Sequence, residues 1–293
     1  MSIPVIDLHY AFHPNANQLD DIVRSIRTAA MSSGFFYVKN HSIDLALVQR
    51  QFELAKELFD LPQSVKKKYD QNNSPSHRGF EEIAAQKLDF TAKADIKEGF
   101  YCGKNYAPDH PFVVAKYQNY GLNQWPHTEV PETEAFCQAY IDAMMGLSER
   151  IMQLLALSLN LPEHYFDECC IDPMVTLRML RYPAHPKDAA ADTFGAGAHT
   201  DWGSITILAQ DDLGGLEVCM PDGVWVSAPP IADTFVVNLG DLIPRWTNGL
   251  YKSNPHRVRN LYSNGKSRYS IPFFMHPRAD MDLTCLASCI DAE

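Results

Sequence analysis

The sequence predicts a mainly β fold, a sandwich or barrel, in which a helical first half supports a strand-rich second half. Two observations carry this prediction. Apolar residues before position 160 recur with the spacing of amphipathic helices, whereas beyond position 172 they fall into short alternating runs. The pairs Asp222-Gly223 and Asn264-Gly265 separate some of these runs and are typical of β-hairpin turns.

Three apolar stripes predict helices in the first half. The first stripe covers residues 19–26, and a short buried strand is expected directly after it over residues 35–38. The second covers residues 48–59 and ends before Pro62, because proline disfavours a helical conformation in the residue that precedes it. The third and longest stripe covers residues 134–159.

The strand-like runs all lie beyond the third helix. They are residues 175–182, 204–209, 215–219, 224–227, 234–239, 256–259 and 268–275. Residues 70–130, in contrast, are rich in Pro, Asn, Gly and His and show little periodicity, which predicts a long irregular excursion. Excursions of this length in compact domains are often lids or binding walls.

No linker separates the two halves, so one compact unit is expected. Residues 1–130 would form its N-terminal helical and irregular region. Residues 131–293 would form a helix and a catalytic β core, the core at about 173–278.

Composition limits the class of protein. Apolar residues make up 46% of the chain and charged residues 21%, as in globular proteins. The formal net charge of −11 argues against nucleic acid or an anionic membrane as the main partner. The seven cysteines show no disulfide framework, and the N-terminal segment lacks the apolar stretch of a signal peptide. Reduced thiols and a cytoplasmic location are therefore expected.

Three residues are candidate metal ligands. His199 and Asp201 are two positions apart, so that in an extended segment both side chains point to the same face. His256 begins another strand-like run and is the best candidate for a third ligand. Two imidazoles and one carboxylate leave the opposite side of a metal open, which suits Fe(II) oxygenases. The chain has 11 histidines, however, so a chance His-x-Asp pair is the alternative explanation.

A second pair of residues strengthens the metal hypothesis. Arg268 and Ser270 share one face of a strand-like run, and the turn before them would bring that face back beside His256. A guanidinium beside a hydroxyl is suited to binding a carboxylate deep in an apolar barrel. 2-Oxoglutarate has such a distal carboxylate, together with a 2-keto acid end that can chelate a metal. Tyr182 can present its hydroxyl inward, either as a structural group or toward this cosubstrate.

Five further residues are candidates for substrate contact, and for each the alternative is packing alone. They are Arg78, Phe100, Arg178, Trp202 and Phe273. Arg178 shares the inward face of its strand with Tyr182, so it can pair either with an anionic substrate or with a buried carboxylate of the protein. Phe273 and Phe274 are expected in the core, where one of them can abut the pocket.

Together these motifs resemble the isopenicillin-N-synthase-like branch of the Fe(II)/2-oxoglutarate-dependent dioxygenases. The resemblance covers nearly the whole chain, including residues 3–8, 33–41, 95–98 and 124–126 in its first half. The more specific motifs follow in order: Leu-Arg-Tyr-Pro at 180–183, His-Thr-Asp at 199–201, Asn-Leu-Gly-Asp at 238–241, Thr-Asn-Gly at 247–249, His-Arg-Val at 256–258 and Arg-Tyr-Ser at 268–270.

The resemblance implies a double-stranded β-helix, or jelly-roll, core with helices packed outside it. It also implies that His199, Asp201 and His256 bind Fe(II), and that Arg268 and Ser270 hold the distal carboxylate of 2-oxoglutarate.

The same resemblance implies roles around that carboxylate. Tyr182 and Asn238 would assist at the cosubstrate site, and Leu208 and Val258 would form its walls. Relatives often carry Asn two positions before the tyrosine, where this chain has Leu180, so the cosubstrate contacts at that position are expected to differ.

The implied activity is the hydroxylation, desaturation or cyclisation of a small organic molecule with O₂, which releases succinate and CO₂, with ascorbate as an additional reductant. Three alternatives stay open: an iron-dependent oxidase of the same fold that does not use 2-oxoglutarate, a zinc-dependent hydrolase, and a catalytically inactive ligand-binding protein. The sequence indicates neither the substrate nor the oligomeric state.

Overall fold

The computed structural model describes residues 2–13, 15–89, 91, 93–184, 194–259 and 265–290. Its strands are β1 (Val5–Asp7), β2 (Phe35–Lys39), β3 (Gly79–Glu81), β4 (Glu98–Cys102), β5 (Met174–Tyr182), β6 (Ala196–His199), β7 (Ile205–Gln210), β8 (Leu216–Cys219), β9 (Trp225–Ser227), β10 (Thr234–Leu239), β11 (His256–Val258) and β12 (Arg268–His276). Its α-helices are α1 (His9–Phe12), α2 (Ala16–Ser32), α3 (Leu45–Asp60), α4 (Gln63–Lys66), α5 (Pro111–Val114), α6 (Thr133–Ser158) and α7 (Leu242–Trp246). The 3₁₀ helices are η1 (Lys67–Tyr69), η2 (Gln71–Asn73), η3 (Glu163–Cys170) and η5 (Ala287–Cys289).

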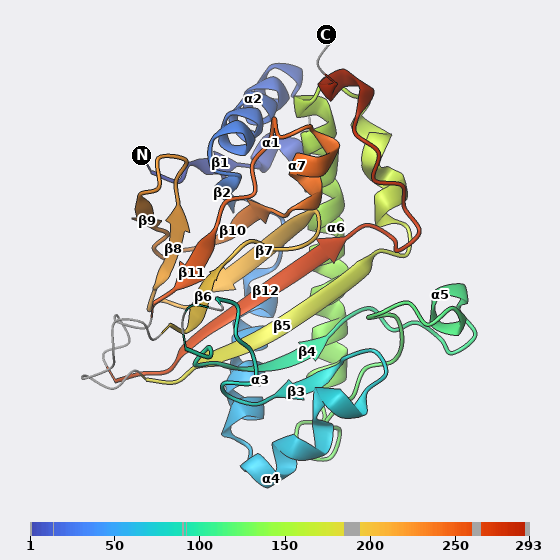
Figure 1. Ribbon diagram of the computed structural model, residues 1–293, viewed down its shortest axis with the longest axis vertical. Helices are drawn as coiled ribbons and strands as arrows, with labels where there is room; N and C mark the ends of the chain where they lie inside the picture. The colour runs from blue at the N-terminus through green and yellow to red at the C-terminus, as the bar shows by residue number, and fades with distance from the viewer. Residues whose placement is uncertain are drawn as a thin grey trace.

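Two sheets form a jelly-roll core (Figure 1). In the described residues the larger sheet has eight strands in the order β1-β2-β10-β7-β12-β5-β4-β3, and the smaller has four in the order β6-β11-β8-β9. The inner faces of the two sheets pack on each other through one apolar cluster, to which Leu180 and Val236 contribute from the larger sheet and Val218 and Val258 from the smaller. This arrangement confirms the predicted fold class.

Helices cover the other face of the larger sheet. The long helix α6 crosses behind the strands in Figure 1, with α2 and α3 beside it. Ile151 and Leu155 of α6 belong to the same buried cluster as Ile207 and Phe273 of the sheet. Because side chains alternate along a strand, each central strand sends one set of residues to the helices and the other set toward the smaller sheet.

The three predicted helices correspond to α2, α3 and α6, and the predicted strands agree with the structure within a few residues. The short helices α1, α4, α5 and α7 and the strands β1, β3, β4 and β6 were not predicted. All five residues of β4 are buried, since the strand lies between β3 and β5. A strand buried on both faces shows no alternation of polar and apolar residues, which is the signal that identified the others. Asn264, half of one predicted turn, lies outside the described residues.

Strands from the first 130 residues extend the large sheet on both sides. At one side β2 pairs with β10, and at the other β4 pairs with β5. The seven cysteines are free thiols. In the part of the chain that the structure describes, no helix is both long enough and apolar enough to cross a membrane.

A glycine between α2 and β2 fixes the approach of two chain segments. Gly34 has φ +71°, and a Cβ atom placed there would lie 2.0 Å from the carbonyl oxygen of Lys252, in the segment that leads to β11. Both the positive φ and the missing space exclude a side chain at this position.

We expect Gly34→Ala to lower the free energy of unfolding by about 2 kcal/mol or more, because it combines backbone strain with a backbone clash. Chemical denaturation monitored by circular dichroism measures this change. Gly146→Ala is the matched control: no atom lies within 4 Å of a Cβ at Gly146 in α6. That variant should be stabilised by about 0.5–1 kcal/mol. Equal stabilities for the two variants would contradict this account.

Candidate active site

A cavity of about 890 Å³ lies between the two sheets. Leu208 and Ser270 line it from the larger sheet, and Leu216 and Val258 from the smaller. Side chains of three predicted groups meet here: the metal-ligand candidates, the 2-oxoglutarate candidates and part of the substrate candidates.

Strand pairing brings the two candidate histidines together. His199 at the end of β6 is the direct antiparallel partner of His256 at the start of β11. Their ring centroids are 4.3 Å apart, and the ring of Phe35 packs edge-on against His256 at 5.3 Å. The Nδ1 atom of His199 lies 2.7 Å from the carbonyl oxygen of Gly197. When Nδ1–H donates to that oxygen, the lone pair of Nε2 is left facing the cavity.

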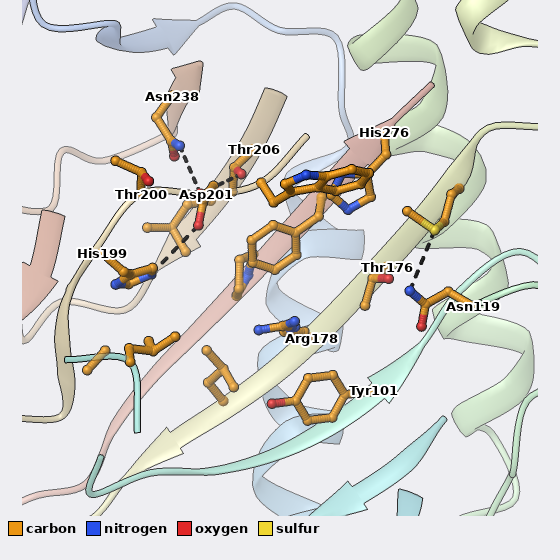
Figure 2. A pocket seen from close by; sticks show the side chains of 18 of the residues that line it. Tyr101, Asn119, Thr176, Arg178, His199, Thr200, Asp201, Thr206, Asn238 and His276 are labelled. Carbon is orange, nitrogen blue, oxygen red and sulfur yellow. Dashed lines mark hydrogen bonds and ion pairs between the residues drawn. The ribbon is translucent and has the colours of Figure 1, made fainter. Parts of the chain in front are cut away.

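Asp201 follows β6 and presents its two carboxylate oxygens to different partners (Figure 2). Oδ2 accepts hydrogen bonds from Thr206 Oγ1 at 2.7 Å and from Asn238 Nδ2 at 2.8 Å. Oδ1 lies 3.7 Å from Nε2 of His199 and 3.6 Å from Nε2 of His256. The hydrogen bonds to Oδ2 therefore orient Oδ1 toward the two imidazoles.

The electrostatics favour the protonation states that a metal requires. Burial and the neighbouring His256 lower the pKa of His199 to about 3, so its imidazole is neutral at pH 7. Burial alone would raise the pKa of Asp201, but the two imidazoles and the hydrogen bonds from Thr206 and Asn238 hold it below its ordinary value. The site thus offers a neutral nitrogen donor at His199 and an ionised carboxylate at Asp201.

This donor set fits a divalent metal ion. One ligand atom from each of His199, Asp201 and His256 lies within 4.8 Å of the others. Within the described residues, Asp201 forms no ion pair with Lys or Arg, so its buried negative charge lacks a permanent cation. Two imidazoles and one carboxylate suit Fe(II) with open coordination positions.

Asp241 connects the two segments that carry these ligands. Its carboxylate accepts hydrogen bonds from Thr200 Oγ1 at 3.0 Å and from Ser253 Oγ at 2.7 Å, and its backbone N–H donates to the carbonyl oxygen of Asp201 at 2.9 Å. Thr200 lies between two ligand candidates, and Ser253 lies three residues before His256. The loop after β10 therefore holds both segments in register.

Arg268 lines the same cavity as the metal-ligand candidates. The guanidinium is 2% exposed; its Nε donates to the carbonyl oxygen of Gly214 at 2.5 Å and its Nη2 to Gln210 Oε1 at 3.2 Å. Its Nη1 is buried and has no partner among the described residues. Arg268 pairs across the strands with Tyr182, and its Cζ lies 4.9 Å from the centroid of the tyrosine ring. A guanidinium held in this way has a donor available for a carboxylate.

Two residues near Asp201 differ in how well the sequence identified them. Asn238, predicted at the cosubstrate site, lines the cavity and donates to Asp201. Thr206 was not predicted, although it does the same from the neighbouring strand, where it pairs directly with Asn238. A single threonine in an apolar strand carries no motif, and the cross-strand pairing was the signal that could have found it.

The structure separates the five predicted substrate residues. Arg178 and Trp202 line the cavity. Arg78, Phe100 and Phe273 are buried outside its wall.

Each residue outside the wall is engaged elsewhere. Arg78 donates to the carbonyl oxygens of Cys102, Asn119 and Val175, at 2.8–3.1 Å, and so holds the excursion against β5. Phe100 and Phe273 belong to the core that faces the helices. Their chain neighbours Tyr101 and Phe274 line the cavity instead, because adjacent residues of a strand point to opposite faces.

Two family models match the chain. The model described as the non-haem dioxygenase in morphine synthesis N-terminal matches residues 3–128. The model described as the 2OG-Fe(II) oxygenase superfamily matches residues 171–277, which include the two histidines, Asp201 and Arg268.

Similar proteins and structures agree with these matches. The 2-oxoglutarate-Fe(II) type oxidoreductase hxnY of Emericella nidulans is 37% identical over 99% of this chain and 83% of its own length. The 2-oxoglutarate-dependent dioxygenase citB of Monascus ruber is 38% identical over 96% of this chain and 86% of its own. The crystal structure of a full-length Neurospora crassa protein in complex with alpha-KG and thymine has a TM-score of 0.86 and 28% identity, and the match covers 99% of this chain and 90% of that one.

We expect Thr206→Val to weaken binding of a divalent metal about 10- to 100-fold, because Asp201 loses one of the two hydrogen bonds that orient it. Isothermal titration with Co(II) under anaerobic conditions measures the affinity. Thr234→Val is the matched control, because the hydroxyl of Thr234 donates only to the backbone of Ile231, on an exposed edge. If both variants bind the metal like the wild type, the proposed role of Thr206 is wrong.

Proposed function

The chain belongs to the 2OG-Fe(II) oxygenase superfamily, and from that premise we propose that its own iron ligands are His199, Asp201 and His256. The protein is an Fe(II)- and 2-oxoglutarate-dependent oxygenase. The observation that carries the assignment of ligands is the convergence of Asp201 Oδ1 on two Nε2 atoms, while Oδ2 is occupied by hydrogen bonds.

Bound Fe(II) supplies, with 2-oxoglutarate and O₂, the oxidising chemistry that converts a C–H bond of the substrate as succinate and CO₂ are released. The residues of this chain position the reactants and exclude water. His199 and His256 would provide the two nitrogen ligands, and the carboxylate of Asp201 would lower the positive charge of the centre, which favours binding of neutral O₂. The apolar walls formed by Leu208, Leu216 and Val258 keep this end of the cavity dry.

Arg268 and Ser270 bind the distal carboxylate of 2-oxoglutarate in this proposal. The support is the unpartnered Nη1 of Arg268, buried beside Ser270 on the inward face of β12. Tyr182 packs against the guanidinium and keeps it oriented. Leu180 offers no polar group two positions before Tyr182, so the cosubstrate receives no amide hydrogen bond from that position.

The substrate is a small organic molecule that enters over Trp202 and reaches Arg178. Trp202 is 58% exposed and stacks near His276, with ring centroids 5.1 Å apart. The Neurospora crassa structure holds thymine together with alpha-KG, which supports a small-molecule substrate in this fold. The motif pattern favours the isopenicillin-N-synthase-like branch, and the seven free thiols suit the cytoplasm.

His199→Ala and Asp201→Ala should each abolish succinate formation from 2-oxoglutarate, because two remaining ligands do not hold iron at working concentrations. Iron content after anaerobic loading should fall in parallel. His164→Ala, which removes an exposed histidine on η3, is the control and should retain both properties. Substantial succinate formation by either ligand variant would refute the metal assignment.

Arg268→Ala should raise the Michaelis constant for 2-oxoglutarate at least about 10-fold, because a charge-assisted hydrogen bond in a buried site is lost. The turnover number at saturating cosubstrate should change less. Steady-state succinate assays over a range of 2-oxoglutarate concentrations measure both constants. Arg50→Ala serves as the control, because Arg50 lies on α3 and does not line the cavity. An unchanged Michaelis constant would mean that residues other than Arg268 bind the distal carboxylate of 2-oxoglutarate. Uptake of O₂ without formation of succinate would favour an oxidase that does not use 2-oxoglutarate.

A further inference from the structure

Arg178 lines the same cavity as Arg268, and it has no polar partner in the part of the chain that the structure describes. Its Nε is buried, and none of its donors forms a hydrogen bond or ion pair with a described residue. Its Cζ instead lies 4.7 Å from the ring centroid of Tyr101 and 4.7 Å from that of Phe274. The rings hold the guanidinium by cation–π contact, while the N–H donors on its edge stay unused.

The position of Arg178 excludes the cosubstrate as its partner. Arg178 and Tyr182 lie on the same inward face of β5, and four residues of strand separate them by about 13 Å. Tyr182 pairs directly with Arg268. The two carboxyl carbons of 2-oxoglutarate are joined by four C–C bonds, which span about 5 Å. A molecule of that length held at Arg268 does not reach Arg178.

No acid among the described residues forms an ion pair with Arg178. Among the described residues, Glu81 and Asp201 are the acids that line the cavity. Glu81 accepts hydrogen bonds from the hydroxyl of Tyr101 and from Gln71. Both oxygens of Asp201 are directed to other groups. The alternative of an internal salt bridge, which the sequence left open, is therefore wrong for the described residues.

The other cations that line the cavity are already partnered. Lys97 pairs with Asp95 at 2.5 Å, and Arg278 pairs with Asp280 at 2.6 Å. Arg268 donates to a carbonyl oxygen and to an amide. Arg178 is thus the lining cation of the described cavity that lacks any polar acceptor, and a buried guanidinium in this condition favours an anionic ligand.

The surroundings of Arg178 also indicate the shape of that ligand. Phe274, Trp202 and His276 line the same end of the cavity with ring faces and edges. Figure 2 shows His199 and Asp201 at the left of the pocket, Arg178 and Tyr101 below its centre, and His276 at the upper right. Flat side chains around a fixed guanidinium suit a planar ring that carries an acidic group.

We propose that Arg178 binds a carboxylate of the substrate, and that the substrate is a small ring-bearing carboxylic acid whose ring packs against Phe274 and Trp202. The inference rests on the proposed function, because it assigns the reacting end of that substrate to the His199–Asp201–His256 centre. The planar fork of the guanidinium binds the carboxylate through two parallel hydrogen bonds and so fixes which ring position faces the metal.

The test uses matched pairs of probes with the iron- and 2-oxoglutarate-loaded enzyme under anaerobic conditions. Benzoate, phenylacetate, cinnamate and 2-naphthoate are each compared with their primary amides, and isothermal titration measures the dissociation constants. The wild type should bind at least one of the acids at least about 10-fold more tightly than its amide, because only the acid forms charge-assisted hydrogen bonds. Arg178→Gln should abolish this preference, and Arg178→Lys should retain only part of it.

Arg181→Gln is the matched control. Arg181 lies on the same strand, pairs with Glu98 and Asp60 on the other face, and does not line the cavity. That variant should keep the wild-type preference for acids. A wild type without preference in any pair, or a folded Arg178→Gln variant that keeps the preference, overturns the inference.

Succinate formed by the wild type without any probe reports the proposed function separately. If the wild type forms succinate but binds each acid and its amide equally well, only the inference about the substrate is overturned. A wild type that forms no succinate under any condition would overturn the proposed function itself, whereas the binding comparison would still decide the role of Arg178.

Discussion

A buried carboxylate with one occupied and one available oxygen is the constraint on which the site depends. Asp201 is 7% exposed, and the hydrogen bonds from Thr206 and Asn238 reach only Oδ2. Hydrogen bonds from neutral groups stabilise the ionised form but leave its charge uncompensated, and a buried ion costs several kcal/mol in desolvation. A dication held by Asp201 and the two imidazoles would offset that cost. The folded chain therefore prepares the site for a metal, and the metal in turn stabilises the fold around it.

The strand pairing of the jelly roll fixes the positions of the other residues that line the cavity. Cross-strand pairing between β6 and β11 sets the two histidines opposite one another, and the loop after β10 joins their flanking segments through Asp241. Strand β5 lines both ends of the same cavity, because Tyr182, Leu180 and Arg178 occupy alternate positions on it. The spacing between Tyr182 and Arg178 is therefore a property of a regular strand, which is stiffer than a loop.

How far the sequence could predict this arrangement depends on which signal each residue carries. The helices and the alternating strands were predictable because burial on one side leaves a periodic pattern. β4 was not, since it is buried on both faces. The site motifs predicted which residues gather around the cavity, but the contact between Thr206 and Asp201 depends on strand register, which no local pattern fixes.

The alternation of side chains along β12 was a usable signal, but the choice of Phe273 as a substrate residue did not take it into account. Arg268 and Ser270 are even-numbered positions of β12, so the inward residue further along is Phe274, and Phe273 belongs to the core. The position of Arg78 outside the cavity could not be predicted in this way, because its carbonyl acceptors come from segments distant in sequence.

Three arginines close to the cavity show how the same side chain acquires different roles. Arg78 donates from both terminal nitrogens to backbone carbonyl oxygens, while its Nε has no partner among the described residues. Burial lowers its pKa to about 10, which still leaves it charged at pH 7. Arg268 is half satisfied and keeps one buried donor. Arg178 has only aromatic rings. Neutral carbonyls and rings orient a guanidinium without cancelling its charge. Of these three arginines, Arg268 and Arg178 line the cavity, and Arg178 has no hydrogen-bond acceptor among the described residues. An anion bound at Arg178 would gain from that charge, whereas a neutral ligand would gain only from packing.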